Sequence, residues 1–242
     1  MNKNSLNLFK RRILDILFCR RCRYCGEVID LREECCSFCS ENLEKIEGKI
    51  CSKCGCEVEG CVCKGGILFY KKICAPFYYR GAVKKAIWQL KFKNKEEAAE
   101  ILAEDMADCF NKRFKGYDFD LCTFVPATKK AVKERGYNQS ELIATALSKL
   151  TDIQCKELLV KSFETEPQHT LPEMRRTGNI VGCFDLKENV VIENMRILLC
   201  DDVKTTGSTL NECAKTLLLG GAAEVFCITA AISSKTSEEI NT

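Results

Sequence analysis

The sequence predicts a small cysteine-rich module followed by a larger α/β domain, in which helices flank a parallel sheet. The chain has 242 residues and 19 cysteines, and eleven of these cysteines lie between Cys19 and Cys63. After Gly66, short apolar runs alternate with amphipathic segments. Strands that alternate with helices form a parallel sheet covered on both faces. We therefore divide the chain into a module of residues 1–66 and a domain of residues 67–242.

The spacing of apolar residues predicts the elements of the larger domain. Val83, Ile87 and Leu90 are three or four residues apart, which predicts a helix over residues 82–90. By the same criteria the remaining elements are a helix over 98–110, a strand over 120–126, a helix over 140–150, a strand over 196–202, a helix over 208–219 and a strand over 224–232. The last three form a strand–helix–strand unit, which is typical of parallel strands.

The composition indicates a folded, soluble protein that stays in the cytosol. Hydrophobic residues make up 46% of the chain and charged residues 29%, whereas disordered chains are depleted in hydrophobic residues. No run approaches the roughly 18 consecutive apolar residues that a membrane span requires. The first residues lack the apolar core and cleavage site of a signal peptide. In a reducing compartment, closely spaced cysteines bind metals rather than form disulfides.

Two pairs of cysteines spaced CxxC predict a zinc site in the small module, as in zinc ribbons. Cys22 and Cys25 form one pair and Cys36 and Cys39 the other, with ten residues between the pairs. Two such pairs supply the four thiolates of a tetrahedral Zn²⁺ site. The alternative is free cytosolic thiols. A module with so few large apolar residues needs a structural metal to hold its fold, which favours zinc.

A second set of cysteines predicts a second structural zinc ion. Its members follow a CxxC and a CxC spacing: Cys51, Cys54, Cys61 and Cys63. This set is less regular than the first, and Cys19, Cys35 and Cys56 are equally close in sequence to the candidate ligands. The spacing therefore predicts one or two zinc ions and leaves open whether one of these three cysteines replaces a candidate.

The segment RILLCDDVKTTGSTL predicts a phosphate-binding loop at the end of a buried strand. The loop offers hydroxyl groups around one glycine: Thr205, Thr206, Gly207, Ser208 and Thr209. Its backbone N–H groups and the dipole of the following helix favour a phosphate dianion. Because Asp201 and Asp202 repel phosphate, they suit the hydroxyls of an attached sugar, or a Mg²⁺ ion that bridges sugar and pyrophosphate oxygens. A capped strand–helix turn, the alternative, leaves the paired acids unexplained.

Four segments of the sequence resemble those of known families. CDDVKTTGSTL is similar to the phosphoribosyl pyrophosphate (PRPP) loop of type I phosphoribosyltransferases. VPATKKAVKERGYNQSELIA, QHTLPEMRRTGN and AIWQLKFKN are similar to three further segments of the ComF family of competence proteins. Together with the cysteine pairs, the resemblance covers nearly the whole chain. It implies a type I phosphoribosyltransferase fold behind an N-terminal zinc module.

The resemblance also implies roles for individual residues. Asp201 and Asp202 would hold the ribose hydroxyls of PRPP, and residues 205–209 its 5′-phosphate. The pyrophosphate would lie on a second loop, formed by Pro126, Ala127, Thr128 and Lys129. A mobile loop that closes over the pyrophosphate would contain Arg135, Asn138 and Gln139. An enzyme of this kind transfers the phosphoribosyl group to a nitrogen nucleophile with Mg²⁺ and releases pyrophosphate, and both acids would be needed for turnover.

Basic and aromatic residues are interleaved over residues 80–95, which predicts a surface for single-stranded nucleic acid. The basic candidates are Lys84, Lys85, Lys91 and Lys93. Trp88 and Phe92 lie among them, and base stacking on aromatic rings adds to the attraction of phosphates. The alternative is that Lys84 and Lys85 form the solvated face of a helix and that Trp88 belongs to the core.

Two functions therefore stay open at the level of the sequence. The first is a PRPP-binding phosphoribosyltransferase that works in DNA uptake. The second is a non-catalytic adaptor that binds single-stranded DNA with the same fold. The ComF resemblance associates both with natural transformation, and it implies a helicase-like partner from the same system. The basic residues within residues 10–23 add to the nucleic-acid interpretation.

Overall fold

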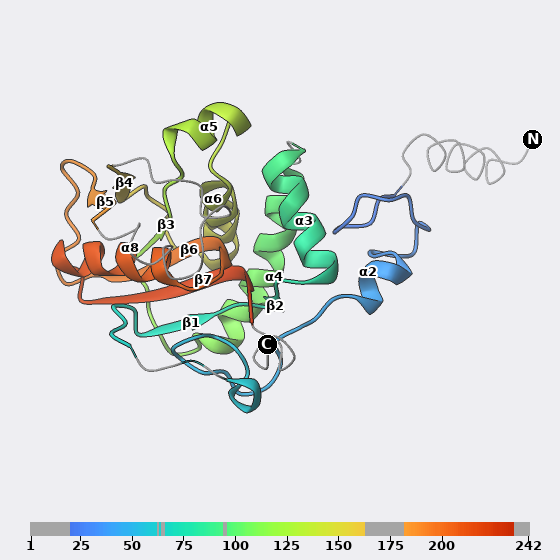
Figure 1. Cartoon of the computed structure of the whole chain (residues 1–242), viewed down its shortest axis with the longest axis horizontal. Helices are drawn as coiled ribbons and strands as arrows, with labels where there is room; N and C mark the ends of the chain where they lie inside the picture. The colour runs from blue at the N-terminus through green and yellow to red at the C-terminus, as the bar shows by residue number, and fades with distance from the viewer. Residues whose placement is uncertain (1–19, 62, 64–65, 94–95, 163–181, 235–242) are drawn as a thin grey trace, which may run out of the picture.

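The computed structural model describes residues 20–61, 63, 66–93, 96–162 and 182–234 (Figure 1). Cys19, the basic residues before Arg20 and the segment QHTLPEMRRTGN lie outside the described residues. The predictions made for them therefore stay predictions.

A parallel sheet forms the centre of the molecule (Figure 1). Its strands lie side by side in the order β1 (Lys72–Cys74), β7 (Glu224–Ile232), β6 (Arg196–Lys204) and β3 (Leu121–Phe124), with β2 (Phe77–Tyr78) also paired to β7. All of these pairings are parallel. The three strands predicted from the sequence are confirmed as β3, β6 and β7. Strands β1 and β2 are too short to show a periodic pattern, so they have no predicted counterpart.

Helices cover both faces of the sheet, as the sequence predicts. On one face lie α4 (Glu97–Arg113) and α6 (Gln139–Thr151), with α3 (Gly81–Phe92) packed against α4. On the other lie α8 (Ser208–Leu219) and the antiparallel pair β4 (Leu159–Lys161) and β5 (Phe184–Leu186). The four predicted helices are thus confirmed. None of the described helices has the length and apolar character needed to cross a membrane.

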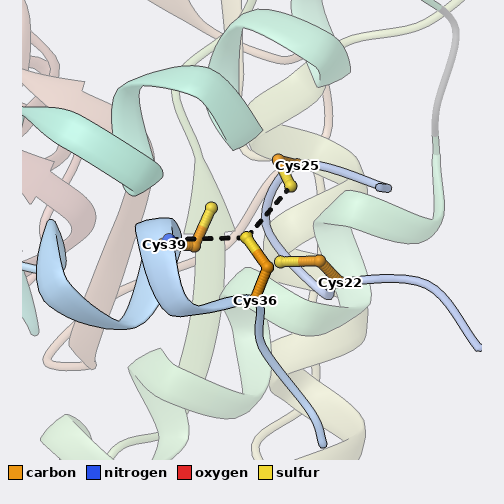
Figure 2. Close-up of side chains that lie close together, drawn as sticks. All are labelled: Cys22, Cys25, Cys36 and Cys39. Carbon is orange, nitrogen blue, oxygen red and sulfur yellow. Dashed lines mark hydrogen bonds between the residues drawn. The ribbon is translucent and has the colours of Figure 1, made fainter. Parts of the chain in front are cut away.

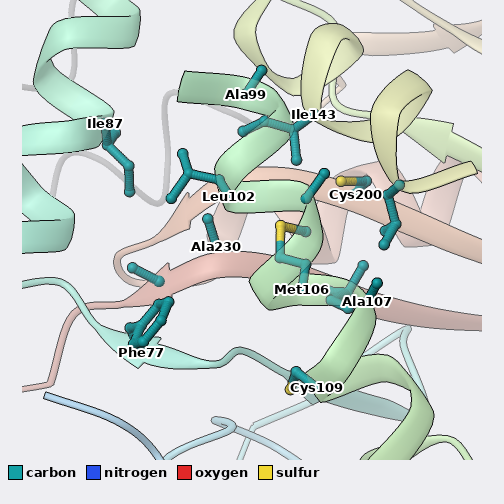
Figure 3. Packing of buried hydrophobic residues seen from close by; sticks show 14 of the residues in the cluster. Phe77, Ile87, Ala99, Leu102, Met106, Ala107, Cys109, Ile143, Cys200 and Ala230 are labelled. Atoms are coloured by element: carbon teal, nitrogen blue, oxygen red, sulfur yellow. The ribbon is translucent and has the colours of Figure 1, made fainter. Parts of the chain in front are cut away.

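The larger core lies between the sheet and the helices α3, α4 and α6 (Figure 3). Leu102 and Met106 of α4 are fully buried there, together with Ile87 from α3 and Ile143 from α6. Burying one such side chain contributes roughly 1.5–3 kcal/mol. This packing holds α3 and α6 in place relative to β6, whose Cys200 belongs to the same core.

The two cysteine-rich segments pack against different parts of the α/β domain. The first contains α2 (Ser37–Glu41) and lies beside α3, where Gln89 Nε2 donates a hydrogen bond to the carbonyl of Cys25 at 2.7 Å (Figure 1). The second lies against β1, where the Ile73 N–H donates to the carbonyl of Ser52 at 3.1 Å. Both segments therefore share buried surface with the domain, and the boundary at residue 66 stays a prediction.

Candidate functional site

Asp201 and Asp202 lie near the carboxyl end of β6, at the edge where parallel α/β sheets bind ligands. Both residues are largely buried, with exposed fractions of 9% and 8%. The Ser140 hydroxyl donates to Asp201 Oδ1 at 2.7 Å, and the backbone N–H of Asp202 donates to the same oxygen at 2.9 Å. Lys91 Nζ lies 2.6 Å from Asp202 Oδ2. The two carboxylates are therefore held by residues from three different elements.

The electrostatics of this acid pair follow from its burial. The pKa of Asp201 is raised to about 7, because burial disfavours its charged form and because the charge of Asp202 lies beside it. The Ser140 hydrogen bond and the Lys91 ammonium oppose this rise. Burial by itself would lower the pKa of Lys91, but the two acids outweigh it and raise that pKa above its ordinary value. Lys91 is therefore a cation at neutral pH.

Residues 205–209 turn from β6 into α8. Gly207 is the N-terminal cap of α8 and has a φ of 86°, a left-handed conformation that glycine adopts without strain. A Cβ at this position would also come within 3.1 Å of the Lys204 Cε atom. The hydroxyl oxygens of Thr206 and Ser208 are 2.9 Å apart, at the start of a helix of 12 residues. Hydroxyls and N–H groups at a helix N-terminus form a favourable environment for an anion.

The predicted pyrophosphate loop follows β3, at the same edge of the sheet as the acid pair, because β3 and β6 are adjacent parallel strands. Pro126 is buried, Ala127 and Thr128 are half-buried, and Lys129 is exposed. Thr128 accepts a hydrogen bond from the Ala131 N–H at 3.0 Å and so caps α5 (Lys129–Arg135). The structure therefore brings this loop and the acid pair to one edge.

The residues that join α5 to α6 are held by buried hydrogen bonds. Asn138 donates from Nδ2 to the carbonyl of Val125 at 3.0 Å, and its Oδ1 accepts the Ser140 N–H at 3.1 Å. Arg135 Nη1 donates to Gln139 Oε1 at 3.0 Å. The closure of Arg135, Asn138 and Gln139 over a pyrophosphate stays a prediction. Arg135 ends α5, Gln139 begins α6, and Asn138 is buried between them because its amide is bonded on both sides.

Ser140 is a site residue that the sequence analysis missed. Its hydroxyl reaches Asp201 because α6 packs against β6, and the two residues are 61 positions apart. Its only signal in the sequence is its position directly after the RGYNQ segment. The periodicity of a sequence predicts a helix but not the strand end against which the start of that helix packs.

Of the basic residues predicted for nucleic acid, three are exposed and one turns inward. Lys91 turns inward to Asp202 and its side chain is only 20% exposed, which differs from its predicted role. Lys85 is exposed and pairs with Glu27 at 3.3 Å. Lys84 and Lys93 are exposed. The prediction assigned all basic residues of 80–95 to one surface. Because residues 81–92 form a helix, successive side chains point in different directions, and Lys91 points to Asp202.

The aromatic residues of α3 face solvent. Trp88 is 47% and Phe92 is 55% exposed, and their ring centroids are 5.9 Å apart. The Lys93 ammonium lies 5.4 Å from the centroid of Trp88, and the Arg135 guanidinium lies 5.3 Å from that of Phe92. The alternative that Trp88 belongs to the core is therefore wrong. These four residues, which we call the aromatic patch, combine exposed rings with cations.

The first cysteine group has the arrangement of a four-sulfur metal site. Figure 2 shows the side chains of Cys22 and Cys25 near those of Cys36, the N-terminal cap of α2, and Cys39, which lies in α2. The four sulfurs lie within 4.8 Å of one another. A tetrahedral site with Zn–S bonds of about 2.3 Å needs sulfurs about 3.8 Å apart. The sulfur of Cys35 lies 3.8 Å from that of Cys22. Cys35 is nevertheless not one of the four residues whose sulfurs all lie within 4.8 Å of one another.

The second group consists of the four predicted ligands, Cys51, Cys54, Cys61 and Cys63, whose sulfurs also lie within 4.8 Å of one another. Cys56 is excluded from it. Its carbonyl accepts the Cys51 N–H at 2.8 Å, so its backbone helps to form the turn that carries the ligands. The donor set of both groups fits Zn²⁺, which thiolates bind in structural sites. The two groups can therefore bind structural zinc, as the spacing predicts.

No family model matches the chain, but curated proteins and solved structures resemble it. Competence protein ComFC of Bacillus subtilis (strain 168) is 29% identical over 204 residues, which cover 79% of this chain and 80% of the relative. DNA utilization protein YhgH of Escherichia coli (strain K12) is 28% identical over 204 residues, 80% of this chain and 88% of the relative. The structure of adenine phosphoribosyltransferase from Thermoanaerobacter pseudethanolicus aligns with a TM-score of 0.37 and 16% identity, over 59% of this chain and 83% of that chain. The curated relatives confirm the resemblance to the ComF family of competence proteins.

Proposed function

We propose that this protein binds phosphoribosyl pyrophosphate at the carboxyl edge of its sheet and acts in the handling of DNA. The observation that carries the proposal is the buried acid pair directly before a hydroxyl-rich loop at the start of α8. Asp201 and Asp202 accept the ribose hydroxyls, and residues 205–209 bind the 5′-phosphate. The names of the curated relatives, which refer to competence and DNA utilization, support the biological setting.

Each part of the edge has its own task in phosphoribosyl transfer. The acid pair orients the ribose, and the N-terminus of α8 holds the phosphate, so the bond from C1 to pyrophosphate points toward the loop of residues 126–129. The Lys129 ammonium and the backbone of that loop offset the charge on the departing pyrophosphate. Mg²⁺ that arrives with the substrate would supply further neutralisation of that charge.

Calorimetry with PRPP and Mg²⁺ tests the proposal, and Gly207→Ala tests the phosphate loop. We expect wild-type protein to bind PRPP and Gly207→Ala to bind it at least about tenfold more weakly, because both the positive φ and Lys204 oppose a side chain there. Gly116→Ala is the matched control, since Gly116 has a φ of 85° with nothing within 4 Å of the added Cβ. It carries the same backbone strain but should leave the PRPP affinity unchanged.

Absence of PRPP binding by the wild-type protein would refute the proposed function. Equal PRPP affinities for Gly207→Ala and Gly116→Ala would instead contradict the role of the loop. The φ angles of Gly207 and Gly116 are nearly equal, so the two variants should lose similar amounts of stability through backbone strain. Their melting temperatures measure this loss.

The aromatic patch supports a second candidate function, the binding of single-stranded DNA by a non-catalytic adaptor. Exposed rings beside cations attract both the bases and the backbone of a single strand. Trp88 is the one tryptophan of the chain, so its fluorescence reports on the patch directly. In the last turn of α3, Lys91 contacts Asp202, whereas the next residue, Phe92, is exposed.

We expect an oligothymidylate to quench the fluorescence of Trp88, with an affinity that falls as salt is added. Phe92→Ala should weaken binding by about 1–3 kcal/mol, the usual contribution of one stacked base. Leu219→Ala is the control, because Leu219 is an exposed apolar residue at the end of α8. Unchanged fluorescence at saturating oligonucleotide, or equal affinities for the two variants, would exclude the patch as the binding surface.

A further inference from the structure

Lys91 and Asp202 form an ion pair in a largely enclosed position. Lys91 Nζ lies 2.6 Å from Asp202 Oδ2, and the two side chains are 20% and 11% exposed. An exposed ion pair contributes little to the stability of a protein. Removal of one partner of an enclosed pair is destabilising, because it leaves the other charge buried without compensation. The arrangement therefore ties the last turn of α3 to the acid pair.

The backbone that carries Lys91 is held from two sides. The Tyr137 hydroxyl donates to the carbonyl of Leu90 at 2.6 Å, and the Gln89 side chain donates to the carbonyl of Cys25 at 2.7 Å. The carbonyls in the last turn of a helix lack partners within the helix, so the Tyr137 contact satisfies one of them. With α3 anchored in this way, the ammonium of Lys91 has a defined position beside Asp202.

Of the four oxygens of the acid pair, two are bonded to described residues. Asp201 Oδ1 accepts the Ser140 hydroxyl and the Asp202 N–H, and Asp202 Oδ2 accepts Lys91. Within the described part of the chain, Asp201 Oδ2 and Asp202 Oδ1 have no hydrogen-bond partner. Neither of these two oxygens is fully buried. One oxygen of each carboxylate is therefore anchored and the other is available to a ligand.

We propose that Lys91, together with Ser140, positions the acid pair so that its two available oxygens accept two neighbouring hydroxyls of a pentose. The proposal rests on the proposed function and assigns the positioning of the sugar-binding acids to residues outside the PRPP loop. Lys91 is a positioning residue here, since it acts on the sugar through Asp202.

Lys91→Met keeps the length of the side chain and removes its charge, so it tests this role. We expect it to weaken the binding of ribose 5-phosphate by about tenfold to a hundredfold, the usual loss for a charged hydrogen bond. Binding of inorganic phosphate, which needs only residues 205–209, should change less than about twofold. Lys91→Arg should restore most of the ribose 5-phosphate affinity, because it keeps a cation beside Asp202.

Lys187→Met is the matched control, since Lys187 pairs with Glu157 on the exposed surface and has no contact with the acid pair. It should bind ribose 5-phosphate like the wild type. A wild type that binds neither PRPP nor ribose 5-phosphate refutes the proposed function and this inference with it. If the wild type binds them, the inference alone is overturned by unchanged or tighter binding in Lys91→Met, or by an equal loss of phosphate and ribose 5-phosphate binding.

Discussion

Replacing Cys39 by serine is expected to remove one of two bound zinc ions and to unfold the first cysteine segment. Cys39 is fully buried, and its group lies in the same core as the helices α3 and α4. A structural zinc ion in a small module contributes an apparent folding free energy of about 10–16 kcal/mol. This is as large as the whole stability of a typical domain, about 5–15 kcal/mol, so the segment cannot keep its fold without the metal.

Zinc analysis of the purified protein measures this effect directly. Wild-type protein should contain two zinc ions per chain and Cys39→Ser one, with new proteolytic cleavage within residues 20–46 and a lower melting temperature. Cys63→Ser is the matched control. Cys63 is an exposed ligand of the second group, so its loss should also remove one zinc ion but leave residues 20–46 protected. Wild-type protein that is folded and free of zinc would contradict the assignment of both groups.

The α/β domain is expected to respond differently, because it has apolar cores of its own. Ile197, Leu199 and Leu217 belong to a buried cluster on the α8 face of the sheet, remote from the first cysteine group. The central strands should therefore stay protected from hydrogen exchange in Cys39→Ser, while α3 loses protection because Gln89 no longer has a fixed partner in Cys25. Loss of protection throughout β6 and β7 would show that the metal supports the whole fold.

Replacing Asp201 by asparagine is expected to stabilise the protein at alkaline pH and to abolish PRPP binding. The pKa of Asp201 is raised to about 7 in the folded protein, mainly by burial and then by Asp202, whereas an unfolded chain has an ordinary aspartate. As pH rises from 4 to 7, the unfolded state loses its proton first, so the stability of the folded state falls. This decrease in stability is complete once the pH exceeds the pKa of Asp201 in the folded protein. The asparagine side chain carries no charge at any of these pH values, so the variant avoids this loss of stability.

Denaturant unfolding at pH 5 and pH 8 measures the difference. The stability gained by Asp201→Asn should grow by about 2–3 kcal/mol between these two values. The substitution keeps an oxygen that can accept the Ser140 hydroxyl, so the local hydrogen bond survives. Asp108→Asn is the control, because Asp108 is exposed on α4 and its replacement leaves Asp201, the source of the pH dependence, in place. An equal pH dependence in wild type and Asp201→Asn would contradict the raised pKa.

The local features of the site could be predicted because short stretches of sequence contain them. The eight candidate metal ligands follow from CxxC and CxC spacing, which sets the geometry within one turn of chain. The run from β6 through Gly207 into α8 follows from an apolar strand, a glycine and an amphipathic helix in direct succession. Two of the three alternative ligands, Cys35 and Cys56, lie among the described residues. Only the folded chain excludes them as ligands, because the choice of ligands depends on which sulfurs converge.

The remaining features depended on packing between distant elements. The sequence by itself determined the order of strands and helices, the acid pair beside the hydroxyl-rich loop and the cysteine pairs, because these depend on local periodicity and spacing. Only the tertiary structure decided that Lys91 and Ser140 anchor the acid pair, and that Trp88 faces solvent while Asn138 is buried. The reason is physical: a lysine on a helix is expected to be a solvated charge unless the fold places a buried carboxylate within reach of it.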